Sequence, residues 1–169
     1  MLRRLALLAL VALPQGEDPG PTVRVEAGAA KVVEGDHVRA LSPGTAPLAL
    51  QAGLASLEAG ARSELEIVWR GAASARISGP ATLELHRTPE LLIADFRVAE
   101  LEVRRGKLVL ELPELGPFEL GEGVLQVRTL PGGVVELQNL GGSALVLRRT
   151  GRDCLEIPAG RRVRIRAEA

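Results

Sequence analysis

The most constraining feature of this chain is the alternation of apolar and polar residues at positions 61–85, ARSELEIVWRGAASARISGPATLEL. Leu65, Ile67 and Trp69 fall on one side of a strand while charged residues fall on the other, which is the pattern of a strand with one buried face. After a Ser-Gly-Pro sequence, which favours reversal of the chain, the alternation resumes at Leu83. We therefore predict two strands here, joined by a tight connection.

Short alternating runs continue to the C-terminus, separated by the turn sequences GEG, LPGG, LGGS, TGRD and IPAG. The strands that these runs predict lie at residues 22–33 (two strands), 48–50, 54–57, 108–112, 118–120, 125–128, 135–137, 144–147, 155–157 and 163–165. Many short strands with Gly or Pro between them predict an all-β fold, either a β-sandwich or jelly roll or a short β-solenoid-like roll of antiparallel strands. A long regular solenoid is disfavoured because no strict repeat is visible.

Three places need separate interpretation. Residues 47–60, PLALQAGLASLEAG, favour two short strands, although the Ala and Leu content leaves a single short helix open. The apolar positions change parity near Ala99, which predicts a β-bulge or a corner. Residues 104–107 predict a hairpin turn, with Gly106 at a position of positive φ.

Composition limits the class of protein. The chain has 169 residues, of which 46% are hydrophobic and only 2% aromatic, so a core has to be built mainly from Leu, Val and Ala. Lys plus Arg and Asp plus Glu both total 21. This balance provides no overall field to attract nucleic acid or an anionic membrane. One domain over residues 22–169 is the expectation from chain length.

The N-terminus predicts export. Arg3 and Arg4 precede an apolar run at residues 5–13, and the polar sequence PQGEDPGP follows, which is the order of a secretory signal peptide. We assign residues 1–21 to this leader and a short linker; a buried N-terminal helix or strand is the alternative. The run is shorter than the roughly 20 residues of a membrane span, and we predict none beyond the leader. The expected location is the bacterial periplasm or the exterior.

The histidines and the single cysteine, which are the residues most able to bind a metal or react, give only weak evidence of a functional site. His37 could join Glu34 and Asp36 around an ion, but a solvated turn is the preferred interpretation, and His86 is expected at the surface. The single Cys154 cannot form an internal disulfide and has no evident partner base, so a half-buried or turn thiol is expected. We predict no metal and no cofactor.

The acidic residues do not indicate an enzyme. A glycosidase needs two carboxylates across a cleft, whereas most here fall on the outward phase of strands, namely Glu64, Glu66, Glu84, Glu102 and Glu136. Neither a GxSxG sequence nor a phosphate-binding loop is present. Trp69, Phe96 and Phe118 fall on inward phases, so sugar binding by ring stacking is not expected. We predict a protein without catalytic residues.

The most suggestive polar feature is the sequence RRVRIR near the C-terminus. Arg162, Arg164 and Arg166 share one face of the predicted strand, opposite Val163 and Ile165. Such a stripe is suited to an acidic protein partner or an anionic polymer of the cell envelope. The alternative is a solvated edge strand whose charges prevent aggregation. These three arginines are the possible partner-binding residues.

Four sequences together resemble the FecR-like periplasmic domain: LEAGARSELEIVW, RISGPATLEL, LEVRRGKLVLEL and ALVLRRTGRDCLEIPAGRRVRI. The elements that carry the resemblance are Gly60 with Ser63, residues 79–85, Gly106 with Lys107, and Ala159 with Gly160. The family's Gly-Thr before its late strand is replaced by LPGGVVEL, and the membrane-spanning and sigma-factor-regulating segments of full-length signalling members are not expected. The resemblance, which covers residues 32–166, implies an extracytoplasmic β domain.

Two functions from different classes follow from these observations. The first is a FecR-like, non-enzymatic exported module that binds an envelope protein or polymer through a sheet edge or face, in sensing or signalling. The second is a lipid-handling jelly roll similar to LptA-type periplasmic proteins. A closed core favours the first, whereas an open groove of some hundreds of Å³ favours the second. An enzyme would require two carboxylates with shifted pKa values facing one cleft.

Overall fold

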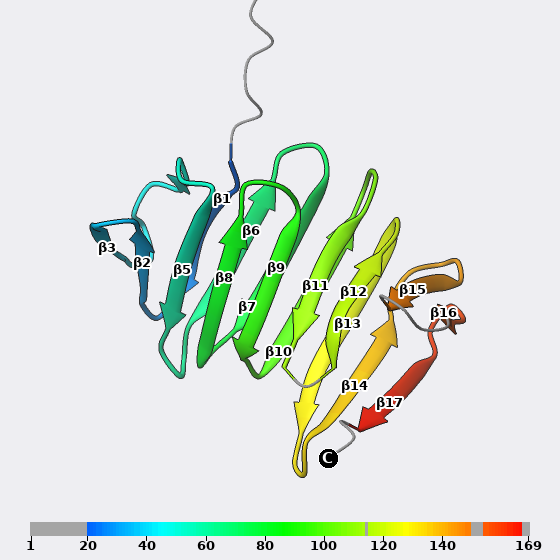
Figure 1. The fold of residues 1–169 in the computed structure, drawn as a ribbon. Helices are drawn as coiled ribbons and strands as arrows, with labels where there is room; N and C mark the ends of the chain where they lie inside the picture. The colour runs from blue at the N-terminus through cyan, green and yellow to red at the C-terminus, as the bar shows by residue number, and fades with distance from the viewer. Residues whose placement is uncertain (1–19, 114, 150–153, 167–169) are drawn as a thin grey trace, which may run out of the picture.

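The computed structural model describes residues 20–113, 115–149 and 154–166, which form two β-sheets packed face to face (Figure 1). Sheet A contains, in spatial order, β17 (Arg162–Arg166), β14 (Val134–Asn139), β13 (Gly123–Leu130), β10 (Val98–Val103), β7 (Ala73–Ser78), β6 (Glu64–Trp69), β1 (Thr22–Ala27) and β4 (Leu48–Ala49). Sheet B contains β16 (Cys154–Ile157), β15 (Leu145–Arg149), β12 (Gly116–Leu120), β11 (Leu108–Leu112), β9 (Glu90–Asp95), β8 (Ala81–His86), β5 (Leu54–Ala59), β2 (Ala30–Glu34) and β3 (His37–Leu41). The prediction of an all-β sandwich is confirmed.

Strand pairing in the described residues is antiparallel except between β9 and β11, which run parallel. No helix in these ranges is long and apolar enough to cross a membrane. The two short strands predicted within residues 47–60 are present as β4 and β5. The strands predicted from residue 108 onward are also present, each within a few residues of the expected bounds.

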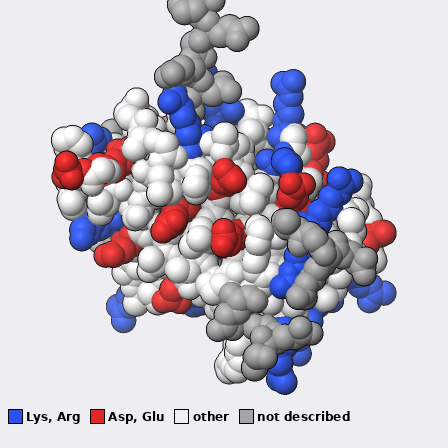
Figure 2. Space-filling view, in the orientation of Figure 1, with Lys and Arg blue, Asp and Glu red and all other residues white. Residues whose placement is uncertain are grey.

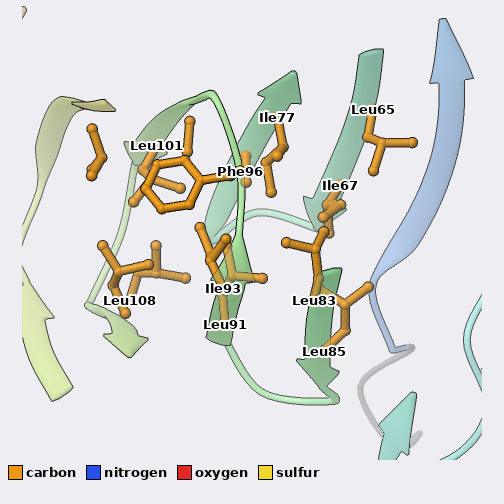
Figure 3. Close-up of a cluster of buried hydrophobic side chains, with 14 of the residues drawn as sticks. Leu65, Ile67, Ile77, Leu83, Leu85, Leu91, Ile93, Phe96, Leu101 and Leu108 are labelled. Atoms are coloured by element: carbon orange, nitrogen blue, oxygen red, sulfur yellow. The ribbon is translucent and has the colours of Figure 1, made fainter. Parts of the chain in front are cut away.

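The core lies between the sheets and consists mainly of the inward-pointing aliphatic residues of both (Figure 3). Leu65 and Ile67 of β6 lie in the same cluster as Leu83 of β8 and Ile93 of β9, and all four are at most 1% exposed. Burial of each such side chain stabilises the fold by about 1.5–3 kcal/mol. The alternation that predicted one-sided strands therefore reflects two sheets, each with one face in the core.

Three connections between the sheets are stacked at the N-terminal half of the sandwich. They join β1 to β2, β5 to β6 and β7 to β8. The hydroxyl of Ser63, which is 2% exposed, donates to the carbonyl oxygen of Ala29 at 2.7 Å and accepts from its N–H at 3.1 Å. Gly79 lies against the same corner, because a Cβ on it would lie 2.1 Å from the carbonyl oxygen of Gly60. We call Gly28, Ala29, Gly60, Ser63 and Gly79 the N-terminal corner.

A second polar side chain holds the connections of the C-terminal half. Asn139 is completely buried, and its amide nitrogen donates to the carbonyl oxygens of Ser143 and Ile157, both at 2.8 Å. Its side-chain oxygen accepts from the N–H of Gly141 at 2.8 Å. These bonds tie the connection from β14 to β15 to the connection from β16 to β17. We call Asn139, Gly141, Ser143 and Ile157 the C-terminal corner.

The structure corrects three details of the predicted topology. Residues 61–85 contain three strands and not two, because β7 contributes Ala73, Ala75 and Ile77 to the core. The Ser-Gly-Pro sequence crosses from sheet A to sheet B, and so does the predicted hairpin turn at residues 104–107. Gly106 in that turn does have a positive φ, of 82°.

The parity change near Ala99 reflects a corner that lies slightly earlier. The chain leaves sheet B after Asp95 and enters sheet A at Val98, which points outward. Phe96 is buried at this corner, and Ala99 is the first inward-pointing residue of β10. The corner was therefore correctly expected, but two or three residues too late along the chain.

Candidate binding edge at strand β17

Strand β17 forms one edge of sheet A in the described part of the chain. Its side chains alternate between exposed and half-buried, with the three arginines exposed and Val163 and Ile165 packed against the core. The prediction that Arg162, Arg164 and Arg166 share one face is confirmed. They lie on the outer face of sheet A, with β14 as the neighbouring strand.

The pairing register determines which backbone groups of β17 face outward. Val163 pairs with Leu137 and Ile165 with Val135, and the N–H of Asn139 donates to the carbonyl oxygen of Arg161 at 2.9 Å. Because backbone groups alternate sides along an antiparallel strand, the odd-numbered residues of β17 bond to β14. The N–H and C=O groups of the three arginines therefore point away from sheet A. The residues whose backbone groups face away from β14 are therefore the same residues that carry the positive charges.

A carboxylate fixes two of these arginines. The Nε of Arg164 lies 3.0 Å from one carboxylate oxygen of Glu136, and a guanidinium nitrogen of Arg162 lies 3.7 Å from the other. The Glu136 side chain is only 6% exposed although it lies on the outward phase of β14. The prediction of its phase was right, but its expected exposure was wrong because the arginines cover it. Among described residues, Arg166 has no ion-pair partner.

The charge along β17 argues against pairing with a second copy of the same strand. An antiparallel pair centred on Arg164 places that residue opposite its own copy and Arg162 opposite Arg166. Like charges directly opposite one another in a sheet are destabilising. An incoming strand with alternating acidic residues would instead meet each arginine with an opposite charge. The edge is thus better matched to an acidic strand than to itself.

The outer face of sheet B has a different character (Figure 2). Acidic side chains are scattered over the middle of this face, and the basic ones lie mostly toward its periphery. Exposed aliphatic side chains also occur in this sheet, with Val38 60%, Leu54 47% and Val146 41% exposed. The outer face of sheet B therefore combines isolated charges with single aliphatic residues.

Glu34, Asp36 and His37, which the sequence offered as possible ion ligands beside the preferred solvated turn, have different surroundings in the structure. Glu34 is 8% exposed, and one oxygen of its carboxylate accepts from the N–H of Gln51 at 2.7 Å and from that of Ala52 at 3.0 Å. Glu34 thus holds the loop after β4 in place. Asp36 is exposed in the turn between β2 and β3, and His37 is exposed at the start of β3. No group of three His, Cys, Asp or Glu side chains suited to a metal ion occurs in the described ranges.

The remaining candidates lie on the surface. His86 lies 3.9 Å from the carboxylate of Glu90, and Cys154 is exposed at the start of β16. Arg104 donates two hydrogen bonds of 3.1 Å to Glu102, and these hydrogen bonds lower the pKa of the Glu102 carboxyl group. A lowered pKa keeps this carboxyl group charged, whereas a general acid needs a raised pKa. Glu102 and Arg104 therefore form a surface ion pair.

Two features were missed in the sequence. Asn139 occurs in an ordinary Gln-Asn-Leu-Gly-Gly sequence, and only the Gly-Gly that follows it indicates a turn. A pocket of about 210 Å³ lies near the tip of the hairpin formed by β13 and β14. Three segments that are distant in the sequence line this pocket, and the spacing of residues in the sequence does not show that they meet.

Trp69, Phe96 and Phe118 are all buried, as predicted, and at most 4% exposed.

Comparison with known proteins adds no identification: no family model matches the chain, and no curated protein or solved structure matches it. The geometry of the edge, the corners and the hairpin pocket is therefore the basis for functional inference.

Proposed function

We propose that this chain is an exported, non-enzymatic binding module of the bacterial envelope, FecR-like in kind, that takes part in sensing or signalling. Its partner is a protein strand with alternating acidic residues, or an anionic polymer, bound along β17. The observation that carries the proposal is the coincidence on β17 of outward backbone groups with outward arginine side chains at residues 162, 164 and 166. The signal-peptide-like order of residues 1–21 supports export.

Backbone contacts and side-chain contacts have different roles in the proposed binding. Backbone hydrogen bonds to a sheet edge give affinity to any extended strand, while side chains at alternate positions select its sequence. Bonds between arginine and a carboxylate are charge-assisted, and each is about twice as strong as a neutral hydrogen bond. Glu136 supports this arrangement because its ion pairs with Arg164 and Arg162 orient both side chains on the sheet surface in the free protein.

The filled interior supports a binding module over an acyl-chain carrier that opens along its length. The inward residues from β1 to β16 form one cluster of buried side chains. A carrier similar to LptA-type proteins would leave a long groove between its sheets. The pocket near the β13–β14 hairpin is small by comparison and lies at one end of the sandwich.

The test measures binding of a labelled seven-residue peptide with alternating Glu and Val by fluorescence anisotropy. Poly-L-glutamate serves as a second probe that has the charge without a fixed strand. We expect reversal of all three arginines to glutamate to weaken both probes by tenfold or more, with a decrease in affinity at high salt. Exposed Arg39 of β3 gives the matched control, and R39E should bind both probes like the wild type.

Two variants at one position separate backbone from side-chain contacts. R164A removes only the guanidinium group, whereas R164P also removes an outward N–H that the sheet does not use. We expect R164P to bind the Glu-Val peptide several-fold more weakly than R164A, with both variants equal toward poly-L-glutamate. Equal peptide binding by the wild type and the triple reversal would overturn the proposal.

A further inference from the structure

A second candidate site is the pocket near the tip of the β13–β14 hairpin, which we call the hairpin pocket. Three segments line it: residues 94–96 at the end of β9 and just after it, residues 112, 113 and 115 at the end of β11 and just after it, and residues 129, 130 and 133–135 of the hairpin. The lining side chains include Phe96, Leu112 and Leu115, each at most 4% exposed, together with the half-buried Leu130 and Val134. The pocket is therefore apolar and lies at one end of the sandwich.

The hairpin forms this pocket because it extends beyond the neighbouring strands (Figure 1). Strand β13 has eight residues, whereas most strands in the sandwich have five or six. The Thr129 hydroxyl donates to the carbonyl oxygen of Phe96 at 2.7 Å and so ties the hairpin to the corner before β10. Gly132 and Gly133, with φ of 80° and 70°, close the turn beyond that bond. The hydrogen bond between Thr129 and Phe96 thus holds this wall of the pocket in place.

Two arginines line a second hollow that has two lining residues in common with the hairpin pocket. A shallower hollow of about 520 Å³ shares Leu130 and Val134 with the hairpin pocket, and its other lining residues include Arg164 and Arg166. Leu130 pairs with Val134, and Val134 pairs with Arg166, so these residues form one cross-strand row. Asp95 lies on another part of the rim. An anionic group entering here is attracted toward the arginines and repelled from Asp95.

We propose that the hairpin pocket binds the single aliphatic chain of an anionic amphiphile, with a phosphate or carboxylate head group paired to Arg166 and Arg164. About 210 Å³ corresponds to about seven water volumes of 30 Å³ each, which is room for a chain of about eight carbons. The pocket does not accommodate the two chains of a phospholipid. This inference does not rest on strand addition at β17, because it uses side chains on the sheet face and no outward backbone group.

The experiment titrates octyl phosphate, below its critical micelle concentration, into the protein and follows methyl resonances by NMR. We expect shifts at the methyl groups of Leu115, Leu130 and Val134, with those of Leu54 and Val38 unchanged. Octanoate tests the carboxylate head group, and octylamine reverses the charge. Butyl phosphate should bind at least tenfold more weakly than octyl phosphate, because each buried methylene changes affinity roughly fourfold.

Two substitutions test the two parts of the site. L130E should abolish octyl phosphate binding, while L54E, a matched change at an exposed leucine, should leave it intact. R166E should weaken octyl phosphate at least tenfold and should not weaken octylamine. If L130E does not fold, the methyl shifts of the wild type and the affinity of R166E still test whether octyl phosphate binds in the hairpin pocket.

Shifts confined to Leu54 and Val38, no shifts at all, or equal affinity for octyl phosphate and octylamine would overturn the inference. R164P keeps its neighbour Arg166 and the apolar lining, so it separates this site from the edge. It should bind the Glu-Val peptide several-fold more weakly than R164A, whereas R164A and R164P should bind octyl phosphate equally. A difference between these two variants toward octyl phosphate would count against a site made of side chains alone.

Discussion

The two ends of the sandwich are finished in different ways. At the N-terminal end, sheet A ends in β4, which has only two residues, and the N-terminal corner is packed so closely that Gly28 and Gly79 leave no room for a Cβ. At the C-terminal end, sheet A ends in β17, which has five residues and an exposed arginine at every second position. The two edge strands of sheet A therefore differ in length and in charge.

The difference shows two solutions to one physical problem. An exposed sheet edge carries free backbone groups that can pair with another chain, and proteins protect it with very short edge strands or with charge. Strand β4 is protected by its short length, and strand β17 is protected by its charge. Charge protects only against partners of the same sign, and this is the reason that we propose binding of an acidic strand at β17. For the N-terminal corner, we expect that substitutions affect stability.

The largest expected effect comes from filling the N-terminal corner. In G79A the new Cβ would lie 2.1 Å from the carbonyl oxygen of Gly60, so the backbone has to move. We expect a loss of about 3 kcal/mol in the free energy of unfolding, at the upper end for overpacked sites. Urea denaturation followed by circular dichroism measures it. G53A is the control because nothing lies within 4 Å of its Cβ, and a similar loss in both variants would show that the corner is not special.

A slightly smaller effect is expected from N139A at the C-terminal corner. The variant leaves two carbonyl oxygens and one N–H without their partner, at a combined penalty of about 2–3 kcal/mol. Because these bonds tie only the last connections together, hydrogen exchange should accelerate in β15–β17 and stay slow in β5–β8. Q138A, at the adjacent half-buried position, should change neither region. Uniform acceleration over both halves would argue against two separately held ends.

Next in size is E136Q, which removes the charge beneath the arginines. Its carboxylate bonds to Arg164 and faces Arg162, so the substitution should reduce the free energy of unfolding by about 1.5 kcal/mol. The difference from the wild type should shrink as salt is added, because Arg162 and Arg164 then repel each other less. Thermal unfolding at low and high salt tests this. E84Q, on a half-buried residue of β8, provides the comparison at an acidic position far from β17.

The smallest effect concerns Glu102, whose carboxyl pKa is lowered by hydrogen bonds from Arg104. A lowered pKa in the folded state means that the stabilisation is present above the unfolded pKa and is lost as the pH falls through the folded pKa. We therefore expect E102Q to be slightly less stable than the wild type at pH 7 and equal to it well below the ordinary glutamate pKa of 4.5. A difference that persists at pH 2 would assign the effect to packing.

Most of the sheet structure could be predicted because alternation reports directly on one-sided burial, as in Leu65, Ile67 and Trp69. Strand β7 escaped because its inward residues include two alanines, which give a weak contrast with their polar neighbours. Turn residues were recognised, yet Gly79 and Gly106 lie in connections that change sheets. Glycine and proline indicate where a chain turns and do not specify which sheet receives the next strand.

The candidate edge was predictable in part for the same reason. The alternate arginines indicated an exposed strand face, but the edge position of β17 depends on which strands lie beside it, and this information is long-range. The burial of Glu136 depends on arginines more than twenty residues away in the sequence. The hairpin pocket requires three segments to meet in space. Each of these features arises from tertiary packing, which a local pattern does not contain.

The most direct test of strand pairing at β17 is amide hydrogen exchange along this strand, measured by NMR with and without the Glu-Val peptide. In the free protein, we expect slow exchange at Val163 and Ile165, which bond to β14, and fast exchange at Arg162 and Arg164. Added peptide should protect the two arginine amides. Binding of the peptide while these amides keep exchanging as fast as before would contradict pairing at this edge.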